Sequence, residues 1–236
     1  PPRSTLFPYT TLFRSYKALK SVVEKGDESY YVEGAAAMAL GKVGSSTLDN
    51  GKDKEKKTLK LLEMVLEKRS GWNEVVRSGA ICGLSVFKSS EAALDLLLPY
   101  TEIGVPQALR LTAIRSLGRI AAGQSKVGCD RILDRLAAIA REEFFLTQVA
   151  VVMALGQMEV AGAVRVLRGL AEQSPDGRVK RRAEEAMGRV RKAIGADKAV
   201  DELRRDLDEL KQLNRDLKSR LETLEAKAKT DKKLEN

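Results

Sequence analysis

The sequence predicts an all-α protein, an α-solenoid of about five helical hairpins followed by one long coiled-coil helix. A short helical pattern recurs five times between residues 32 and 188, and a seven-residue period of leucines begins near residue 200. The composition agrees, because 43% of the residues are hydrophobic and 32% are charged, whereas only six are proline. Such a balance favours packed helices over disorder.

The recurring pattern starts with a usually aliphatic residue, followed four positions later by Ala or Val. A small residue comes three positions after that, directly before Leu or Met and then usually Gly. Spacings of 4, 3 and 1 trace one face of an α-helix, and small residues on that face let a neighbouring helix approach closely. The Leu or Met positions are 44, 33, 38 and 32 residues apart: Leu40, Leu84, Leu117, Leu155 and Met187.

A second amphipathic segment precedes each copy, so the repeating unit is a helix–turn–helix; Tyr16–Lys25 is the shorter partner of the first copy. Hairpins of this length cannot bury their apolar faces alone, and we therefore expect them to stack over residues 16–195. The polar, lysine-rich segment Ser45–Lys57 predicts a loop inserted between repeats. Helix starts are marked by four residues, three as N-caps and the proline in the first turn: Ser29, Asn73, Asp176 and Pro106.

The first fifteen residues are expected to be foreign to the protein. Thr5–Ser15 (TLFPYTTLFRS) is, codon by codon, a translation of a common sequencing adapter, and such a scar is left out of fold reasoning. We therefore expect residues 1–15 to be an artefact and the native sequence to start near Tyr16, as the C-terminal part of a longer protein. A cytoplasmic location is expected, with a signal peptide in the missing part left open.

Residues 196–228 predict a leucine-zipper-like coiled coil, and residues 229–236 a disordered tail. Asn214 at a central a position favours an in-register parallel pair, because a buried amide is satisfied by its copy across the axis. A homodimer is therefore expected; a helix folded back on the solenoid and a free helix are the alternatives. The expected dimerisation residues occupy the a and d positions: Val200, Leu203, Leu207, Leu210, Asn214, Leu217, Leu221 and Leu224.

Several kinds of chemistry are excluded by the composition. The chain has no histidine, which rules out His-containing zinc sites and catalysis with an imidazole base. No carboxylate pair stands out, because Glu142-Glu143 and Glu184-Glu185 are sequence neighbours that point in different directions on a helix; solvated faces explain both. Cys82 and Cys129 are interpreted as reduced thiols of the core. We expect no catalytic residue, no metal site and no cofactor in this chain.

We expect neither nucleic acid nor a membrane as a partner. The net charge is +9, but the basic residues are spread out and mixed with acidic ones. A basic stretch at residues 178–192 is compatible with a DNA-binding basic region; we reject it because Ala183, Ala186 and Met187 complete a repeat face there and Gly195 breaks the run. No run of 18 apolar residues is present, so no transmembrane helix is expected.

The V-R-x-x-A-x-x-x-L pattern, with Val76-Arg77, resembles HEAT repeats. Three segments, NEVVRSGA from Asn73, GVPQALRL from Gly104 and FFLTQVAVVMALGQ from Phe144, resemble the C-terminal helical region of bacterial zinc aminopeptidases of the alanyl/puromycin-sensitive (gluzincin) family. The resemblance implies a non-catalytic region that shapes the substrate cavity beside a missing catalytic domain. That domain would supply the H-E-x-x-H and G-x-M-E-N motifs and the zinc, all absent here.

The alternative function is a HEAT scaffold that binds a peptide or protein on its concave face and is unrelated to peptidases. Fold alone does not choose between the two. Four polar residues at equivalent positions of the second helices are interpreted as a ladder of structural contacts between repeats, with a binding groove as the other possibility: Arg77, Arg110, Gln148 and Lys180.

Overall fold

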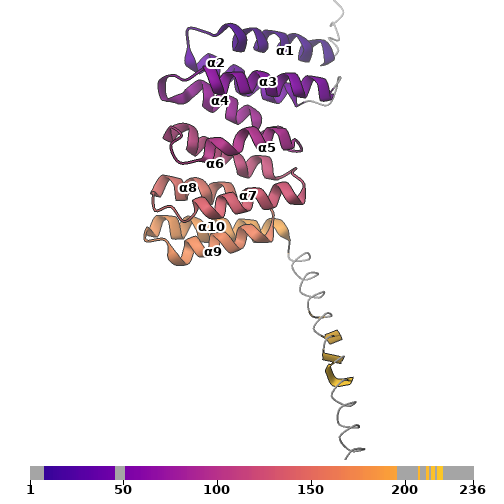
Figure 1. Cartoon of the computed structure of the whole chain (residues 1–236), viewed down its shortest axis with the longest axis vertical. Helices are drawn as coiled ribbons and strands as arrows, with labels where there is room; N and C mark the ends of the chain where they lie inside the picture. The colour runs from indigo at the N-terminus through magenta and orange to yellow at the C-terminus, as the bar shows by residue number, and fades with distance from the viewer. Residues whose placement is uncertain are drawn as a thin grey trace, which may run out of the picture. The chain divides into compact units, whose positions relative to one another are not determined.

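Helical hairpins are stacked in sequence order in the computed structural model, which describes residues 8–45, 51–195 and, farther on, Leu207, Lys211, Gln212, Asn214, Arg215 and Leu217–Ser219 (Figure 1). Residues up to Val190 form one compact unit, and those from Arg191 onward form another. The helices of the first hairpins are α1 (Pro8–Lys25), α2 (Tyr30–Gly44), α3 (Gly51–Lys68), α4 (Val75–Leu84), α5 (Glu91–Leu97) and α6 (Gln107–Ala121). Those that follow are α7 (Lys126–Ile139), α8 (Phe145–Leu155), α9 (Ala161–Gln173) and α10 (Gly177–Ile194), and two 3-10 turns are η1 (Trp72–Glu74) and η2 (Leu98–Thr101).

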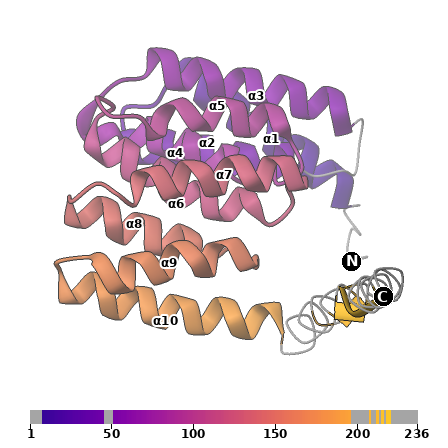
Figure 2. The same ribbon diagram turned by 60° about the horizontal axis from the view of Figure 1, so that its bottom comes forward.

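Each odd-numbered helix pairs with the even-numbered helix after it, and Figure 2 shows the two rows from another side. The second helices α2, α4, α6 and α8 pack on one another in series, and first helices pack likewise, α1 on α3, α3 on α5 and α7 on α9. The predicted stacking of five hairpins is therefore confirmed. None of the helices in the described part is both long enough and apolar enough to cross a membrane.

Small residues set the spacing between the second helices, as the sequence pattern predicts. A Cβ atom placed on Gly79 of α4 would lie 2.8 Å from the Cα of Gly34 in α2, and one on Gly83 would lie 2.8 Å from the carbonyl oxygen of Ala37. The neighbour is backbone in both cases and cannot swing aside. These glycines are therefore what lets α2 and α4 touch backbone to backbone.

The repeat pattern marks the core correctly in the second, third and fourth copies, whereas Val32 and Ala39 of the first copy and Met187 of the fifth are not buried. All four Leu residues at the Leu or Met position are fully buried, Leu40 among them. Val32, which opens the first copy, is 48% exposed, whereas the adjacent Glu33 is 3% exposed. The buried face of α2 therefore runs through Glu33 and Ala37, the face on which Gly34 approaches α4.

The expected loop at Ser45–Lys57 is wrong over its second half. Helix α3 begins at Gly51, so residues 51–57 are helical; residues 46–50 lie outside the described part. Lysine and glutamate are good helix formers, and their charges are solvated at the exposed start of this helix, where Lys56 and Lys57 are exposed. A polar composition was thus a poor guide to a loop here.

The predicted helix starts are met in part. Asp176 caps α10, because its Oδ1 accepts a hydrogen bond from the Arg178 amide at 2.8 Å. Ser29 precedes α2 without a side-chain cap bond, and Pro106 stands just before α6 instead of in its first turn. The interpretation of Asn73 as a cap is wrong, because α4 begins two residues later, at Val75.

The ends of the chain bear on three further predictions. Helix α1 begins at Pro8, so it includes the last eight residues of the expected adapter segment without a break at Tyr16. Gly195, with a φ of 79°, follows α10 as the predicted helix breaker. Most of the predicted coiled coil at 196–228, and all of the tail at 229–236, lie outside the described residues, as do residues 1–7.

Candidate functional site

Each copy of the repeat pattern opens with a usually aliphatic residue, and the polar residue directly after it links one repeat to the next in most copies. This position holds Glu33, Arg77, Arg110, Gln148 and Lys180 in the five copies. In three copies its side chain contacts the turn between the two helices of the following hairpin: Glu33 with Arg69, Arg110 with Glu142, and Gln148 with Ser174. Structural contacts between repeats, one of the two interpretations of these residues, therefore describe most of this ladder.

Arg110 makes the most extensive contact of the ladder. Its Nη1 and Nη2 atoms donate to the two carboxylate oxygens of Glu142 at 2.8 and 2.6 Å, and its Nε donates to the Thr101 carbonyl at 2.8 Å. Only 12% of the Arg110 side chain and 25% of the Glu142 side chain is exposed. Glu142, expected on a solvated face, is therefore a partner in a two-pronged ion pair that joins the third and fourth hairpins.

The first two copies use the same position differently. Glu33 is buried, and its Oε1 lies 3.3 Å from Nε of Arg69, which follows α3. Arg77 instead pairs with Glu74 of its own hairpin, and this hydrogen bond raises the pKa of the Arg77 guanidinium. For Lys180, in the fifth copy, no partner is found within the described residues.

In four of the five hairpins, exposed apolar side chains gather where the first helix turns into the second helix. Among residues 14–45 and 52–195, nine large hydrophobic side chains are exposed, and seven of them lie in these turns or in the first turn of the next helix. The turns lie along one edge of the stack, on the left in Figure 1. We call this the hairpin-turn edge, and its exposed residues are Tyr30, Tyr31, Val32, Trp72, Ile103, Phe144 and Leu146.

Aromatic contacts tie neighbouring turns together along this edge. The rings of Tyr31 and Trp72 meet edge to face, with centroids 6.0 Å apart, and the Arg178 guanidinium lies 4.1 Å from the ring centroid of Phe145. Both contacts join one hairpin to the next, yet Tyr31 remains 64% exposed and Trp72 56% exposed. The edge is thus ordered but not covered.

The turn before α4 has an unusual backbone. Asn73 and Glu74 both have positive φ values, 50° and 57°, a left-handed conformation that is uncommon outside glycine and asparagine. It lies directly after Trp72 and connects that residue to the start of α4. This turn was not predicted, because its only signal in the sequence is the asparagine, which tolerates this conformation and also caps helices.

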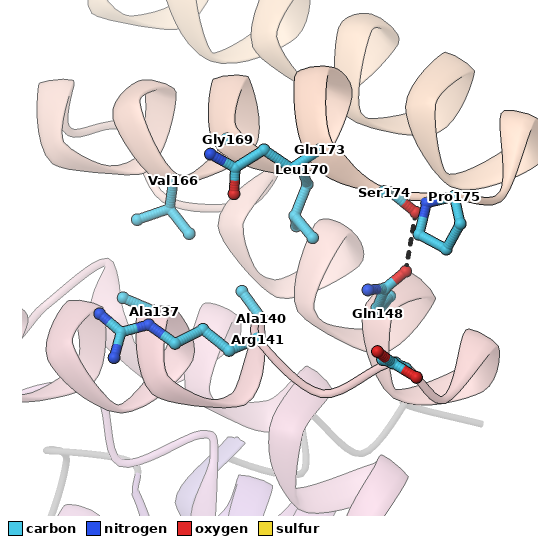
Figure 3. Close-up of a pocket in the computed structure, with 11 residues that line it drawn as sticks. Ala137, Ala140, Arg141, Gln148, Val166, Gly169, Leu170, Gln173, Ser174 and Pro175 are labelled. Atoms are coloured by element: carbon cyan, nitrogen blue, oxygen red, sulfur yellow. Dashed lines mark hydrogen bonds between the residues drawn. The ribbon is translucent and has the colours of Figure 1, made fainter.

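A pocket of about 420 Å³ lies between the fourth and fifth hairpins (Figure 3). The end of α7 and the residues after it form one wall, and α9 forms the other. Two buried polar side chains of the ladder, Gln148 and Ser174, meet at its far end, where the Ser174 hydroxyl donates to Gln148 Oε1 at 2.9 Å. The lining residues are Ala137, Ala140, Arg141, Glu143, Gln148, Val166, Gly169, Leu170, Gln173, Ser174 and Pro175.

The sequence did not single out this pocket. Gln148 was recognised as a ladder residue, but the space beside it results from the small residues Ala137, Ala140 and Gly169 on the facing helices. A helical pattern marks where side chains are large and apolar. It does not predict where small side chains leave an empty space between helices.

The remaining predicted residues occupy separate places. Cys82 and Cys129 are partly exposed free thiols, so they belong to the boundary of the core and not to its interior; burial raises the pKa of the Cys129 thiol. Among the predicted dimerisation residues, Leu207, Asn214 and Leu217 are helical and exposed. Val200, Leu203, Leu210, Leu221 and Leu224 lie outside the described part.

Residues 94–188 match the family model of HEAT repeats. No curated protein matches the chain. The matched range begins in α5 and ends in α10, so it covers three of the stacked hairpins, together with the pocket and the Arg110–Glu142 pair. The predicted repeat type is confirmed for that range, and the chain contains a HEAT-repeat helical region.

Proposed function

We propose that this chain is a non-catalytic scaffold that binds a protein partner along the hairpin-turn edge. The observation that carries the proposal is that, among residues 14–45 and 52–195, seven of the nine exposed large hydrophobic side chains gather on that edge. Contiguous exposed apolar surface on a folded protein commonly marks an interaction site. Tyr and Trp, which this edge exposes at Tyr30, Tyr31 and Trp72, are enriched at protein interfaces and among the residues that dominate binding energy.

The order of the edge also supports binding. The ring contact between Tyr31 and Trp72 holds these two exposed side chains in place before any partner arrives. Side chains that are already ordered lose little further conformational freedom on binding, which favours affinity. The ladder serves the same purpose, because it fixes three of the turns against the preceding hairpin through contacts such as Arg110 with Glu142.

The proposal is tested with two triple variants of the full chain in the cells that naturally produce it. Tyr31→Ser, Trp72→Ser and Phe144→Ser alter the edge, whereas Val127→Ser and Met153→Ser, with Val86→Ser, alter apolar side chains away from it. We expect the parent and the control to co-purify with the same protein in constant proportion, and the edge variant to lose it. Retention by the edge variant, with unchanged helical content, would contradict the proposal.

A more specific form of the proposal makes the partner the catalytic domain of a zinc aminopeptidase that contains this chain. It rests on the three resembling segments, which lie at η1 and the start of α4, at the start of α6, and along α8. Their apolar positions, such as Val76, Leu109 and Val151, are buried between helices. Helix packing accounts for much of the likeness, so support for this context is weaker than for the scaffold.

The aminopeptidase context has a direct test in the parent gene. An in-frame H-E-x-x-H motif with a G-x-M-E-N segment upstream of the codon for Tyr16 would establish it, and this fragment would then show no peptidase activity with added zinc. A start codon close to Tyr16, or a different upstream domain, would remove this context and leave the scaffold with a separate partner.

We further propose that the segment after Gly195 dimerises the scaffold as a coiled coil. Leu207 and Leu217, at a and d positions, are 47% and 56% exposed in the single chain, and a second copy would cover them. Sedimentation of the full chain is expected to show a dimer at tens of micromolar. Asn214→Leu is expected to change the oligomeric state or register, and a monomeric parent would overturn this proposal.

A further inference from the structure

We infer that the pocket between α7 and α9 binds an acidic peptide segment of the protein partner. An apolar side chain of the peptide would lie on the pocket floor, a peptide group would bond to Gln148, and a carboxylate would pair with Arg141. The inference rests on the proposed function and deepens it, because the pocket lies between the last two turns of the hairpin-turn edge.

The first element of this site is a hydrogen-bond donor with a fixed direction. The Asp176 amide donates to Ser174 Oγ at 3.3 Å, and the Ser174 hydroxyl donates in turn to Gln148 Oε1 at 2.9 Å. Because Oε1 accepts this bond, the Gln148 Nε2 atom points toward the pocket (Figure 3). Gln148 is only 5% exposed, and Nε2 has no hydrogen-bond acceptor among the described residues. Nε2 is not one of the buried atoms without a partner, so it is accessible from the pocket, where a peptide carbonyl can accept a hydrogen bond from it.

The second element is an apolar floor with room above it. Val166 and Leu170 of α9 face Ala137 and Ala140 across the pocket. A Cβ atom placed on Gly169 would meet no atom within 4 Å, so the space there is open. The volume of about 420 Å³ is large enough for an aliphatic side chain with its flanking peptide groups.

The third element is a pair of opposite charges on the walls. Arg141 and Glu143 both line the pocket, both are exposed, and neither forms an ion pair within the described residues. A peptide matches this arrangement, because its N–H can donate to Glu143 while a neighbouring carboxylate pairs with Arg141. A nucleic-acid phosphate matches it less well, because a phosphate offers no N–H donor for the Glu143 carboxylate.

The experiment uses the full chain labelled with nitrogen-15 and three short peptides. Ac-Ala-Leu-Glu-NH2 carries a side-chain carboxylate, Ac-Ala-Leu-OH carries a C-terminal one, and Ac-Ala-Leu-Gln-NH2 carries neither. The Gln148 side-chain NH2 signal, identified by its loss in Gln148→Met, reports occupation of the pocket. We expect it to shift saturably with at least one acidic peptide, at a dissociation constant at least about threefold lower than for the neutral peptide.

A substitution inside the pocket and a matched one outside it show whether the peptides bind in the pocket. Gly169→Leu fills the open space and is expected to weaken acidic-peptide binding by at least about tenfold; Gly188→Leu, at a helical glycine with equally open surroundings in α10, is expected to leave it unchanged. Arg141→Gln is expected to remove the preference for the acidic peptides. The peptide that binds more tightly identifies the source of the carboxylate as side chain or C-terminus.

Several results would overturn the inference. These are the absence of a saturable shift up to millimolar peptide, equal binding of neutral and acidic peptides, or undiminished binding by a folded Gly169→Leu variant. The proposed function fails separately: if the edge variant keeps its partner while peptides still occupy the pocket, only the assignment of the edge is wrong. If the edge variant loses the partner but the pocket does not bind these peptides, only the assignment of the pocket is wrong.

Discussion

Replacing Gly79 by alanine is expected to destabilise the protein, although the same change usually stabilises a helix. Alanine is more favourable than glycine inside a helix by about 1 kcal/mol. At Gly79, however, the new Cβ would lie 2.8 Å from the Cα of Gly34 in the facing helix, and the obstacle is backbone. Overpacking of a close contact costs about 1 to 3 kcal/mol, and a rigid neighbour favours the upper end. We therefore expect a net loss of about 1 to 2 kcal/mol.

The matched control is Gly188→Ala in α10, where a Cβ would meet no atom within 4 Å. Here only the helix preference remains, so a gain of up to about 1 kcal/mol is expected. Urea unfolding followed by circular dichroism at 222 nm, with equal slopes for the parent and both variants, measures the two changes. If Gly79→Ala were as stable as the parent or more stable, the close approach of α2 and α4 would not be what requires glycine.

Three further predictions use the same chain. Arg110→Met leaves Glu142 without its partner and is expected to cost about 1 to 3 kcal/mol in urea unfolding; no loss would mean that the pair adds nothing to the stacking. Hydrogen bonds from the Arg178 side chain and amide lower the pKa of Asp176 to about 2, below the ordinary value of about 3.9. Its carboxylate therefore stabilises the fold fully above about pH 4, and this contribution is lost as the pH falls through about 2. Asp176→Asn should therefore reduce the melting temperature more at pH 6 than at pH 2. Burial raises the pKa of Cys129, so its alkylation by iodoacetamide at pH 8 should be slower than that of an unfolded peptide with the same cysteine, as followed by mass spectrometry.

Much of the fold could be predicted because stacked hairpins repeat their packing requirements in the sequence. The 4, 3, 1 spacing located all five second helices, and the small residues within it indicated close approach. The ladder was also predictable in kind, since Arg110 and Gln148 occupy equivalent positions in their copies. The particular partners, Glu142 and Ser174, were not, because they lie in turns whose geometry no periodic pattern encodes.

The candidate site was less predictable for the same reason. Exposed residues such as Trp72 and Phe144 belong to no buried stripe, so only their positions after folding show that they share an edge. The start of α3 at Gly51 was missed because solvated lysines suit a helix and a loop equally well. The pocket was not predicted because its open space results from the absence of a side chain at Gly169.

The most direct test of the central claim is site-specific photocrosslinking along the hairpin-turn edge. A photoreactive phenylalanine analogue is placed at Trp72 or Phe144 on the edge, or at Val127, an exposed apolar position at the start of α7 and away from it, in the full chain within the cells that produce it. The account predicts that both edge positions form an adduct of the same mass with one partner and that Val127 does not. Adducts at Val127 alone, or equally at all three positions, would contradict the assignment of this edge as the binding surface.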